Sequence, residues 1–132
     1  PNWILTPHPG EAGRLLQRGT AEVQQDRFAS VAAIQVKFGG VAILKGAGTL
    51  IASEDELAVS TSGNPGMASG GMGDVLAGVI AGLLAQGLPM KEAAQQGVHI
   101  HGLAADRAVE KDGERGLLAS DLMSHLRQLV NS

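Results

Sequence analysis

The first apolar residues of the chain, at positions 3 to 6 (WILT), predict a short buried strand. The two prolines in the segment at residues 6 to 10 (TPHPG) exclude a helix before Glu11. Two leucines then lie at helical spacing, so we expect the first helix to run from Glu11 to Arg18.

A second, longer helix is predicted from Thr20 to about Phe38. Thr20 is a residue type that caps helix N-termini, and Gly39-Gly40 ends the helical pattern. The predicted apolar side of this helix consists of Val23, Phe28, Val31, Ile34 and Phe38.

Three short apolar runs follow and predict three strands. The run from Val41 to Lys45 is typical of a buried strand, and Leu50 to Ser53 and Leu57 to Ser60 are the next two. The turn Gly46-Ala47-Gly48 separates the first two strands. The acidic segment Glu54-Asp55-Glu56 predicts a solvated hairpin turn between the second and third strands.

The rest of the chain predicts three helices after a glycine-dense loop at residues 61 to 73. Their expected ranges are Asp74 to Gln86, Lys91 to Val109 and Ser120 to Val130. Strands followed by helices, with crossovers, predict one α/β layered domain. Small residues along the first of these helices predict close packing against a sheet or another helix: Ala77, Gly78, Ala81, Gly82 and Ala85.

Composition narrows the functional classes. With 132 residues the chain is long enough for one domain, and its net charge of −3 gives no support to nucleic-acid binding. The absence of cysteine excludes a disulfide or a thiolate metal site and fits a reducing cytoplasm. The longest apolar run, Val75 to Ala85, is shorter than the ~20 residues that span a bilayer, so we expect no membrane segment.

The chain begins with Pro1 and reaches an apolar strand within a few residues. We therefore interpret residues 1–132 as part of a longer protein. We expect weak or absent activity from the isolated piece, and an exposed sheet edge that favours association.

The most informative segment is GNPGMASGGMGDVLAG, at residues 63 to 78. Glycines let a ligand approach the backbone without a Cβ in the way. Where such a loop opens a helix, free N–H groups and the helix dipole favour a bound phosphate. We therefore predict an anion hole at Gly70, Gly71, Met72 and Gly73. The alternative is a flexible turn that leads into a helix.

Asp74 lies where the predicted helix begins. One interpretation is an acid in the first turn whose interaction with the helix dipole stabilises the helix by ~0.3–1 kcal/mol. The other is catalytic, because a carboxylate beside a phosphate site repels the ligand and is seldom tolerated there without a function. Such a carboxylate can accept the proton of a hydroxyl group that attacks phosphorus.

The segment at residues 63 to 78 resembles the signature of the ADP- or ATP-dependent NAD(P)H-hydrate dehydratases, which belong to the ribokinase-like superfamily. The shorter element Gly71-Met72-Gly73-Asp74 is similar across that superfamily, whereas the longer run is more specific. The similarity extends from TPHPGE near the start to HGLAAD at residues 101 to 106. It implies the second half of a ribokinase-like three-layer α/β/α fold.

The resemblance also implies roles for residues in two other segments. In the dehydratase pattern the histidine of TPHPGE, here His8, contacts the hydrated dinucleotide substrate, as does Asp74. Glu11 lies at the position that helps related kinases to place Mg²⁺ and phosphate, often through water. The KGxxT pattern borders the adenine nucleotide in the family and implies nucleotide contacts for Lys45, Gly46, Ala47, Gly48 and Thr49, together with Gly73.

The activity that the resemblance implies is the repair of hydrated NADH or NADPH, a lyase reaction that consumes ADP or ATP with Mg²⁺. The substrate hydroxyl attacks the terminal phosphate, and the phosphate ester is then eliminated, with Asp74 as the base. The family leans toward ADP in bacteria. It further implies a cytoplasmic homo-oligomer, such as the tetramers of related bacterial enzymes, and an epimerase domain upstream in many relatives.

Two other classes of function stay open at this point. A small-molecule kinase of the same superfamily, for a thiazole or hydroxymethylpyrimidine, would stop at the phosphoester. A nucleotide-sensing module would bind nucleotide without consuming it, but it would give Asp74 no purpose.

The remaining candidates are interpreted as structural. His99 and His101 lie two residues apart on a predicted helix and so face different sides, which argues against a shared metal. Met67 and Met72 are expected to pack beneath the glycine loop. The HGLAAD segment receives no chemical role.

Overall fold

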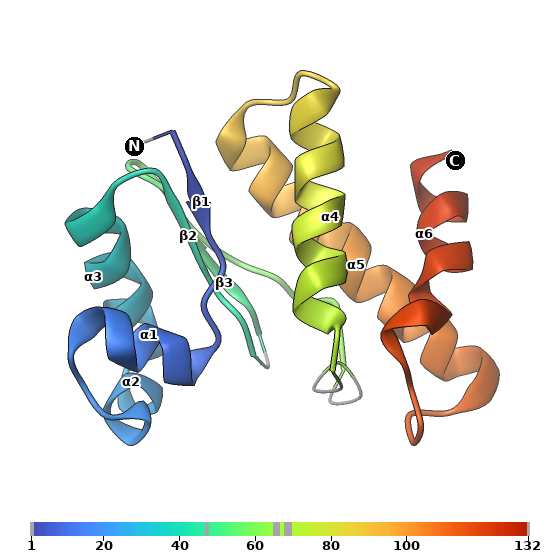
Figure 1. The fold of residues 1–132 in the computed structure, drawn as a ribbon, viewed down its shortest axis with the longest axis horizontal. Coiled ribbons are helices and arrows are strands. Elements are labelled where there is room, and N and C mark those ends of the chain that lie inside the picture. The colour runs from blue at the N-terminus through green and yellow to red at the C-terminus, as the bar shows by residue number, and fades with distance from the viewer. Residues whose placement is uncertain (1, 47, 65–66, 68–69, 132) are drawn as a thin grey trace.

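A mixed sheet of four strands, in the order β1-β2-β3-β4, lies between two groups of helices (Figure 1). This computed structural model describes residues 2–46, 48–64, 67 and 70–131. β1 pairs in parallel with β2, and the β2–β3 and β3–β4 pairs are antiparallel. The strands are β1 (Ile4–Leu5), β2 (Val41–Leu44), β3 (Leu50–Ala52) and β4 (Leu57–Val59).

The helices cover both faces of the sheet, as the predicted three-layer arrangement requires (Figure 1). One group follows β1 and precedes β2, and the other follows β4. In chain order they are α1 (Pro9–Leu16), α2 (Thr20–Gln25), α3 (Arg27–Phe38), α4 (Met72–Ala85), α5 (Met90–Asp112), the short 3-10 helix η2 (Ala119–Leu122) and α6 (Met123–Val130).

Alternation along β2 divides the core between the two faces. Val41 and Ile43 pack against α4 and α5, whereas Ala42 and Leu44 pack against α1, α2 and α3. All four side chains are buried, because successive residues of a strand point to opposite faces and both faces are covered. A third cluster joins α4, α5 and α6 around Leu122.

The strand directions bring three loops to one edge of the sheet. β1 and β2 are parallel, and two successive antiparallel pairings give β4 the direction of β2. The loops that follow β1, β2 and β4 therefore leave from the same edge. Ligands of α/β proteins bind outside the carboxyl ends of strands, so this edge is the expected place for a site.

The prediction that proline excludes helix before Glu11 was wrong. α1 begins at Pro9, with His8 as its N-cap. Proline fits the first turn of a helix, because the N–H that it lacks would have no partner there.

The single helix predicted from Thr20 to Phe38 is interrupted at Asp26, whose backbone is extended (φ −144°, ψ 87°). Its carboxylate accepts a hydrogen bond from the Ala29 N–H at 2.9 Å and so caps α3. This break turns Phe28 outward, with 54% of its surface exposed, so its assignment to the apolar side was also wrong. Trp3 likewise lies outside the core, at 49% exposed.

The expected role of the small residues in α4 is reversed. Leu76, Ile80 and Leu83 form its buried face, whereas Gly78 and Gly82 are exposed and a Cβ on either would meet nothing within 4 Å. The close approach comes from Gly97 of α5, where a Cβ would lie 2.6 Å from Ile80 Cγ1. No helix among the described residues is both long and apolar enough to cross a bilayer.

Candidate active site

Lys45 joins the three loops at the sheet edge. Its backbone N–H donates to the Pro7 carbonyl at 3.0 Å, which ties the end of β2 to the segment before α1. Its side chain reaches across to α4, because a Cβ built on Gly73 would lie 2.9 Å from Lys45 Nζ. A positive charge thus lies against the first turn of that helix.

The first turn of α4 has free backbone donors. Gly71, the N-cap, adopts a left-handed conformation (φ 83°), and its carbonyl accepts the first helical bond from Val75 at 3.1 Å. The N–H groups of Met72, Gly73 and Asp74 have no acceptor among the residues that the structure describes. Gly70 and Gly71 are exposed in the turn before the helix. The geometry is therefore that of an open anion site.

Asp74 lies in the same turn, and its side chain is exposed. Within the described part of the chain it forms no hydrogen bond or ion pair. Within the described residues the carboxylate therefore makes no contact that holds the fold together, and its exposure leaves it accessible to a ligand.

His8 and Glu11 form a capping box at the start of α1. The Glu11 N–H donates to His8 Nδ1 at 3.2 Å, and the His8 N–H donates to Glu11 Oε1 at 3.1 Å. The hydrogen bond from the His8 N–H to the Glu11 carboxylate is the main reason that the pKa of Glu11 lies below its ordinary value. The positive charge of Lys45 acts in the same direction. Both side chains are about half exposed, at 53% and 46%, so both are accessible to a ligand.

Gly46, Gly48 and Thr49 lie between β2 and β3. Thr49 Oγ1 donates to the Gly46 carbonyl at 3.1 Å, and Gly48 has a positive φ of 67°. The side chain of Arg27 in α3 lies against Gly46, since Arg27 Nη2 would lie 2.9 Å from a Cβ built on Gly46. Ala47 lies outside the described residues.

The donor set fits a magnesium ion that nucleotide phosphates help to hold. Mg²⁺ binds through one or two carboxylates together with phosphate oxygens and water. Glu11 is charged and accessible, and no group of three acidic, histidine or cysteine side chains suited to a metal occurs within the described residues. The described residues of this region therefore provide no all-protein metal cage.

His101 and His99 behave as the sequence indicated. His101 is 4% exposed beneath the first turn of α4, and His99 is exposed. Met72 is buried and Met67 packs against the same cluster, as expected. Sequence reasoning missed Asp106, which binds the first residues of the glycine loop, and Ala119, whose Cβ would lie 3.2 Å from a Cβ on Gly71.

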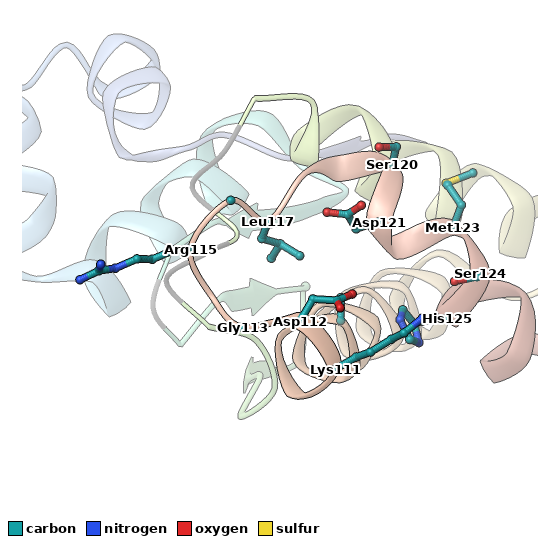
Figure 2. A pocket seen from close by; sticks show the side chains of 12 residues that line it. Lys111, Asp112, Gly113, Arg115, Leu117, Ser120, Asp121, Met123, Ser124 and His125 are labelled. Carbon is teal, nitrogen blue, oxygen red and sulfur yellow. The ribbon is translucent and has the colours of Figure 1, made fainter.

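A hollow of about 430 Å³ lies between the end of α5 and α6 (Figure 2). Its lining comes from residues 108 to 125, and no predicted site residue is part of it. Asp121, in this lining, already accepts the Leu118 N–H at 2.8 Å to cap η2.

Comparison with known proteins identifies the family of the chain. A family model described as NAD(P)H-hydrate dehydratase matches residues 1–128. A bifunctional NAD(P)H-hydrate repair enzyme from Coxiella burnetii is 60% identical over 131 residues, which is 98% of this chain and 27% of that protein. An ADP-dependent (S)-NAD(P)H-hydrate dehydratase from Neisseria meningitidis is 52% identical over 98% of this chain and 45% of its own length.

Solved structures give the same result. The ADP/ATP-dependent NAD(P)H-hydrate dehydratase from Bacillus subtilis, co-crystallised with ATP and Mg²⁺, superposes with a TM-score of 0.91 at 33% identity. A ribokinase-like superfamily protein from Enterococcus faecalis superposes with a TM-score of 0.80 at 34% identity. These comparisons confirm the ribokinase-like α/β fold. The chain covers 47% of the Bacillus chain, so it spans less than half of these relatives. On the family model and these identities, the chain belongs to the NAD(P)H-hydrate dehydratase family.

Proposed function

We propose that the protein containing this chain dehydrates hydrated NADH or NADPH at the expense of ADP or ATP. The observation that carries the proposal is the first turn of α4, where amides and an Asp74 carboxylate that have no partner among the described residues occur together with the Lys45 ammonium. The family match and the relatives' names support it. The kinase alternative has no observation of its own in its favour.

The first step is phosphoryl transfer. The substrate hydroxyl oxygen attacks the terminal phosphorus of the nucleotide, and Asp74 accepts the hydroxyl proton. An O–P bond forms while the bond from that phosphorus to its bridging oxygen breaks, which releases AMP from ADP or ADP from ATP. The amides of Gly70 to Gly73 and the Lys45 ammonium would bind the negative charge of the transferring group.

The second step is elimination. The C–O bond to the phosphate breaks, inorganic phosphate leaves, and the ring loses a proton to restore the dihydronicotinamide. His8, accessible at the start of α1, would contact the dinucleotide substrate. Mg²⁺, when bound, would neutralise phosphate charge, with Glu11 placing it through water.

The nucleotide is proposed to lie over the KGAGT segment, residues 45 to 49. Lys45 supplies a donor there and Gly48 leaves the backbone open, whereas the Thr49 hydroxyl donates to the Gly46 carbonyl and the Arg27 guanidinium fills the space beside Gly46. Backbone amides bind a phosphate group regardless of how many phosphates the nucleotide carries, so the same geometry accepts both ADP and ATP.

The wider biology remains a set of predictions. The Coxiella relative is named bifunctional, which supports an accompanying second domain in the full-length protein. A homo-oligomer, such as a tetramer, and a cytoplasmic location are expectations from the resemblance. Size-exclusion chromatography with light scattering on the full-length protein tests the first of these.

The experiment that tests the function is Asp74→Asn in the full-length protein. We expect ADP and ATP binding, measured by calorimetry, to stay nearly unchanged while recovery of reduced nicotinamide absorbance is lost. Asp112→Asn, an exposed acid at the end of α5, is the control and should keep normal turnover. Near-normal turnover by Asp74→Asn would show that Asp74 is not the base. A stable phosphorylated alcohol from the wild type would indicate the kinase.

A further inference from the structure

The glycine loop rests on one stretch of α5, residues 99 to 106. Ser62 Oγ donates to the His99 carbonyl at 3.1 Å. Gly102 lies directly below, since a Cβ there would clash with Ser62 Oγ and lie 2.8 Å from the Ser62 carbonyl carbon. The backbone before the loop is thus in contact with the helix, and glycine at 102 permits that contact.

Asp106 holds the next two residues with both of its oxygens. Oδ2 accepts the Gly63 N–H at 2.9 Å, and Oδ1 accepts Asn64 Nδ2 at 2.8 Å. These partners lie more than forty positions earlier in the chain, so the bonds fix a long-range arrangement. Hydrogen bonds to a carboxylate are shorter and stronger than neutral ones.

The identity of the residue matters because both partners are donors. A carboxylate offers an acceptor to each of them. An asparagine in its place would offer one oxygen and one NH₂ group, and that NH₂ group would face a donor. The site therefore calls for an acid and not merely for a polar side chain.

α5 also determines the position of the far end of the loop. The loop ends in the first turn of α4, and α4 packs on α5 through Ile80 and Gly97. Both ends of the loop thus take their position from the same helix. Met67 links the two ends, because its Sδ would lie 2.8 Å from a Cβ on Gly63 and its side chain packs in the same cluster as Met72 of α4.

We propose that Asp106 is a positioning residue that clamps the start of the glycine loop and so aligns its amides with the transferring phosphoryl group. This inference rests on the proposed function for its effect on turnover, and on the geometry alone for its effect on the loop. It predicts a loss in kcat with little change in nucleotide affinity, because misalignment costs most in the transition state.

The test compares Asp106→Asn and Asp106→Ala with Glu110→Gln, an exposed acid one turn further along α5. In the full-length protein we expect kcat for hydrated NADH to fall about 10- to 100-fold in both Asp106 variants, with KM for ADP within about threefold. Glu110→Gln should keep both constants. A folded Asp106→Asn with wild-type kcat would overturn the proposal.

Amide hydrogen exchange gives a second readout that does not depend on the reaction. Exchange at Gly63 and Asn64 should quicken in the Asp106 variants while the core strands keep their protection, whereas a merely structural defect would quicken exchange throughout. Unchanged exchange at Gly63 and Asn64 would overturn the clamp even if the enzyme is active. If the wild type fails to dehydrate hydrated NADH, the proposed function falls and this readout still decides the clamp.

Should the Asp106 variants fail to fold, Asn64→Ala provides the substitute. It removes one of the two bonds and leaves the Gly63 N–H bond in place. A smaller loss of kcat with the same near-constant KM is expected. Wild-type turnover in a folded Asn64→Ala variant would contradict the proposal.

Discussion

The ammonium of Lys45 occupies the space in which residue 73 would carry a side chain: a Cβ built on Gly73 would lie 2.9 Å from Lys45 Nζ. The residue that follows β2 is thereby in contact with the helix that follows β4. Neither the strand nor the helix alone creates the positive region at the site. It arises because glycine at 73 leaves room for a charge supplied from elsewhere in the chain.

Gly73→Ala should therefore lower nucleotide binding without unfolding the protein. Position 73 lies within α4, where alanine is favourable for the backbone, but its methyl group would displace the end of a flexible lysine. We expect calorimetry on the full-length protein to show ADP affinity reduced about 3- to 30-fold, with Tm unchanged or slightly raised. Gly19→Ala, at an exposed position with nothing within 4 Å, is the matched control. Unchanged ADP affinity in Gly73→Ala would argue against the contact.

Lys45→Met tests the charge itself. Methionine keeps much of the length of the chain but removes the ammonium, so one charge-assisted contact to phosphate is lost. We expect ADP and ATP to bind about 10- to 100-fold more weakly, which corresponds to the usual worth of a hydrogen bond to a charged group. Lys111→Met, exposed on α5, should bind both nucleotides normally. Equal affinities for Lys45→Met and the wild type would show that Lys45 does not contact the phosphates.

Local sequence signals predicted the elements well but not the contacts between distant segments. The apolar run of β2 is encoded within a few residues and was placed correctly, and α4 begins at Met72, two residues before its predicted start. Asp26 interrupts the predicted second helix because its carboxylate accepts the Ala29 N–H and caps α3, a hydrogen bond that it would not make inside a continuous helix. Such competition between local alternatives is difficult to resolve from spacing alone.

The site divides in the same way. The proposed anion site at the start of α4 follows from glycine content and the helix that begins there. The partnership of Asp106 with Gly63 joins residues that only the folded chain brings together, so the HGLAAD segment had no readable role. The prediction from the small residues of α4 failed for a related reason. A glycine permits close packing of two helices, but the sequence does not show which glycines lie at the contact, which here is made by Gly97 of α5.

Gly97→Ala and Gly82→Ala should change stability in opposite directions. A Cβ on Gly97 would lie 2.6 Å from Ile80 Cγ1, so α4 and α5 must shift apart, at a cost of about 1–3 kcal/mol. A Cβ on Gly82 meets nothing within 4 Å in an exposed part of α4, so alanine should stabilise the helix by about 0.5–1 kcal/mol. Urea unfolding of this chain measures both. Equal effects would mean that α4 does not pack on α5 through Gly97.

His101 should make stability depend on pH below neutrality. Burial lowers the pKa of His101 to about 4, the charge of Lys45 acts in the same direction, and a hydrogen bond to the Met72 backbone opposes them. The ordinary value of 6.5 applies when the chain is unfolded, so the unfolded state binds an extra proton between these two pH values. Stability from the neutral ring is thus fully present above pH ~6.5 and is lost as pH falls toward ~4, by on the order of 2–3 kcal/mol.

The variant His101→Gln lacks the titrating group. The free energy of unfolding of this variant should therefore fall less over that pH range than the free energy of unfolding of the wild type. His99→Gln, on the exposed side of the same helix, should follow the wild-type curve. Parallel curves for His101→Gln and the wild type would show that His101 titrates normally in the folded chain.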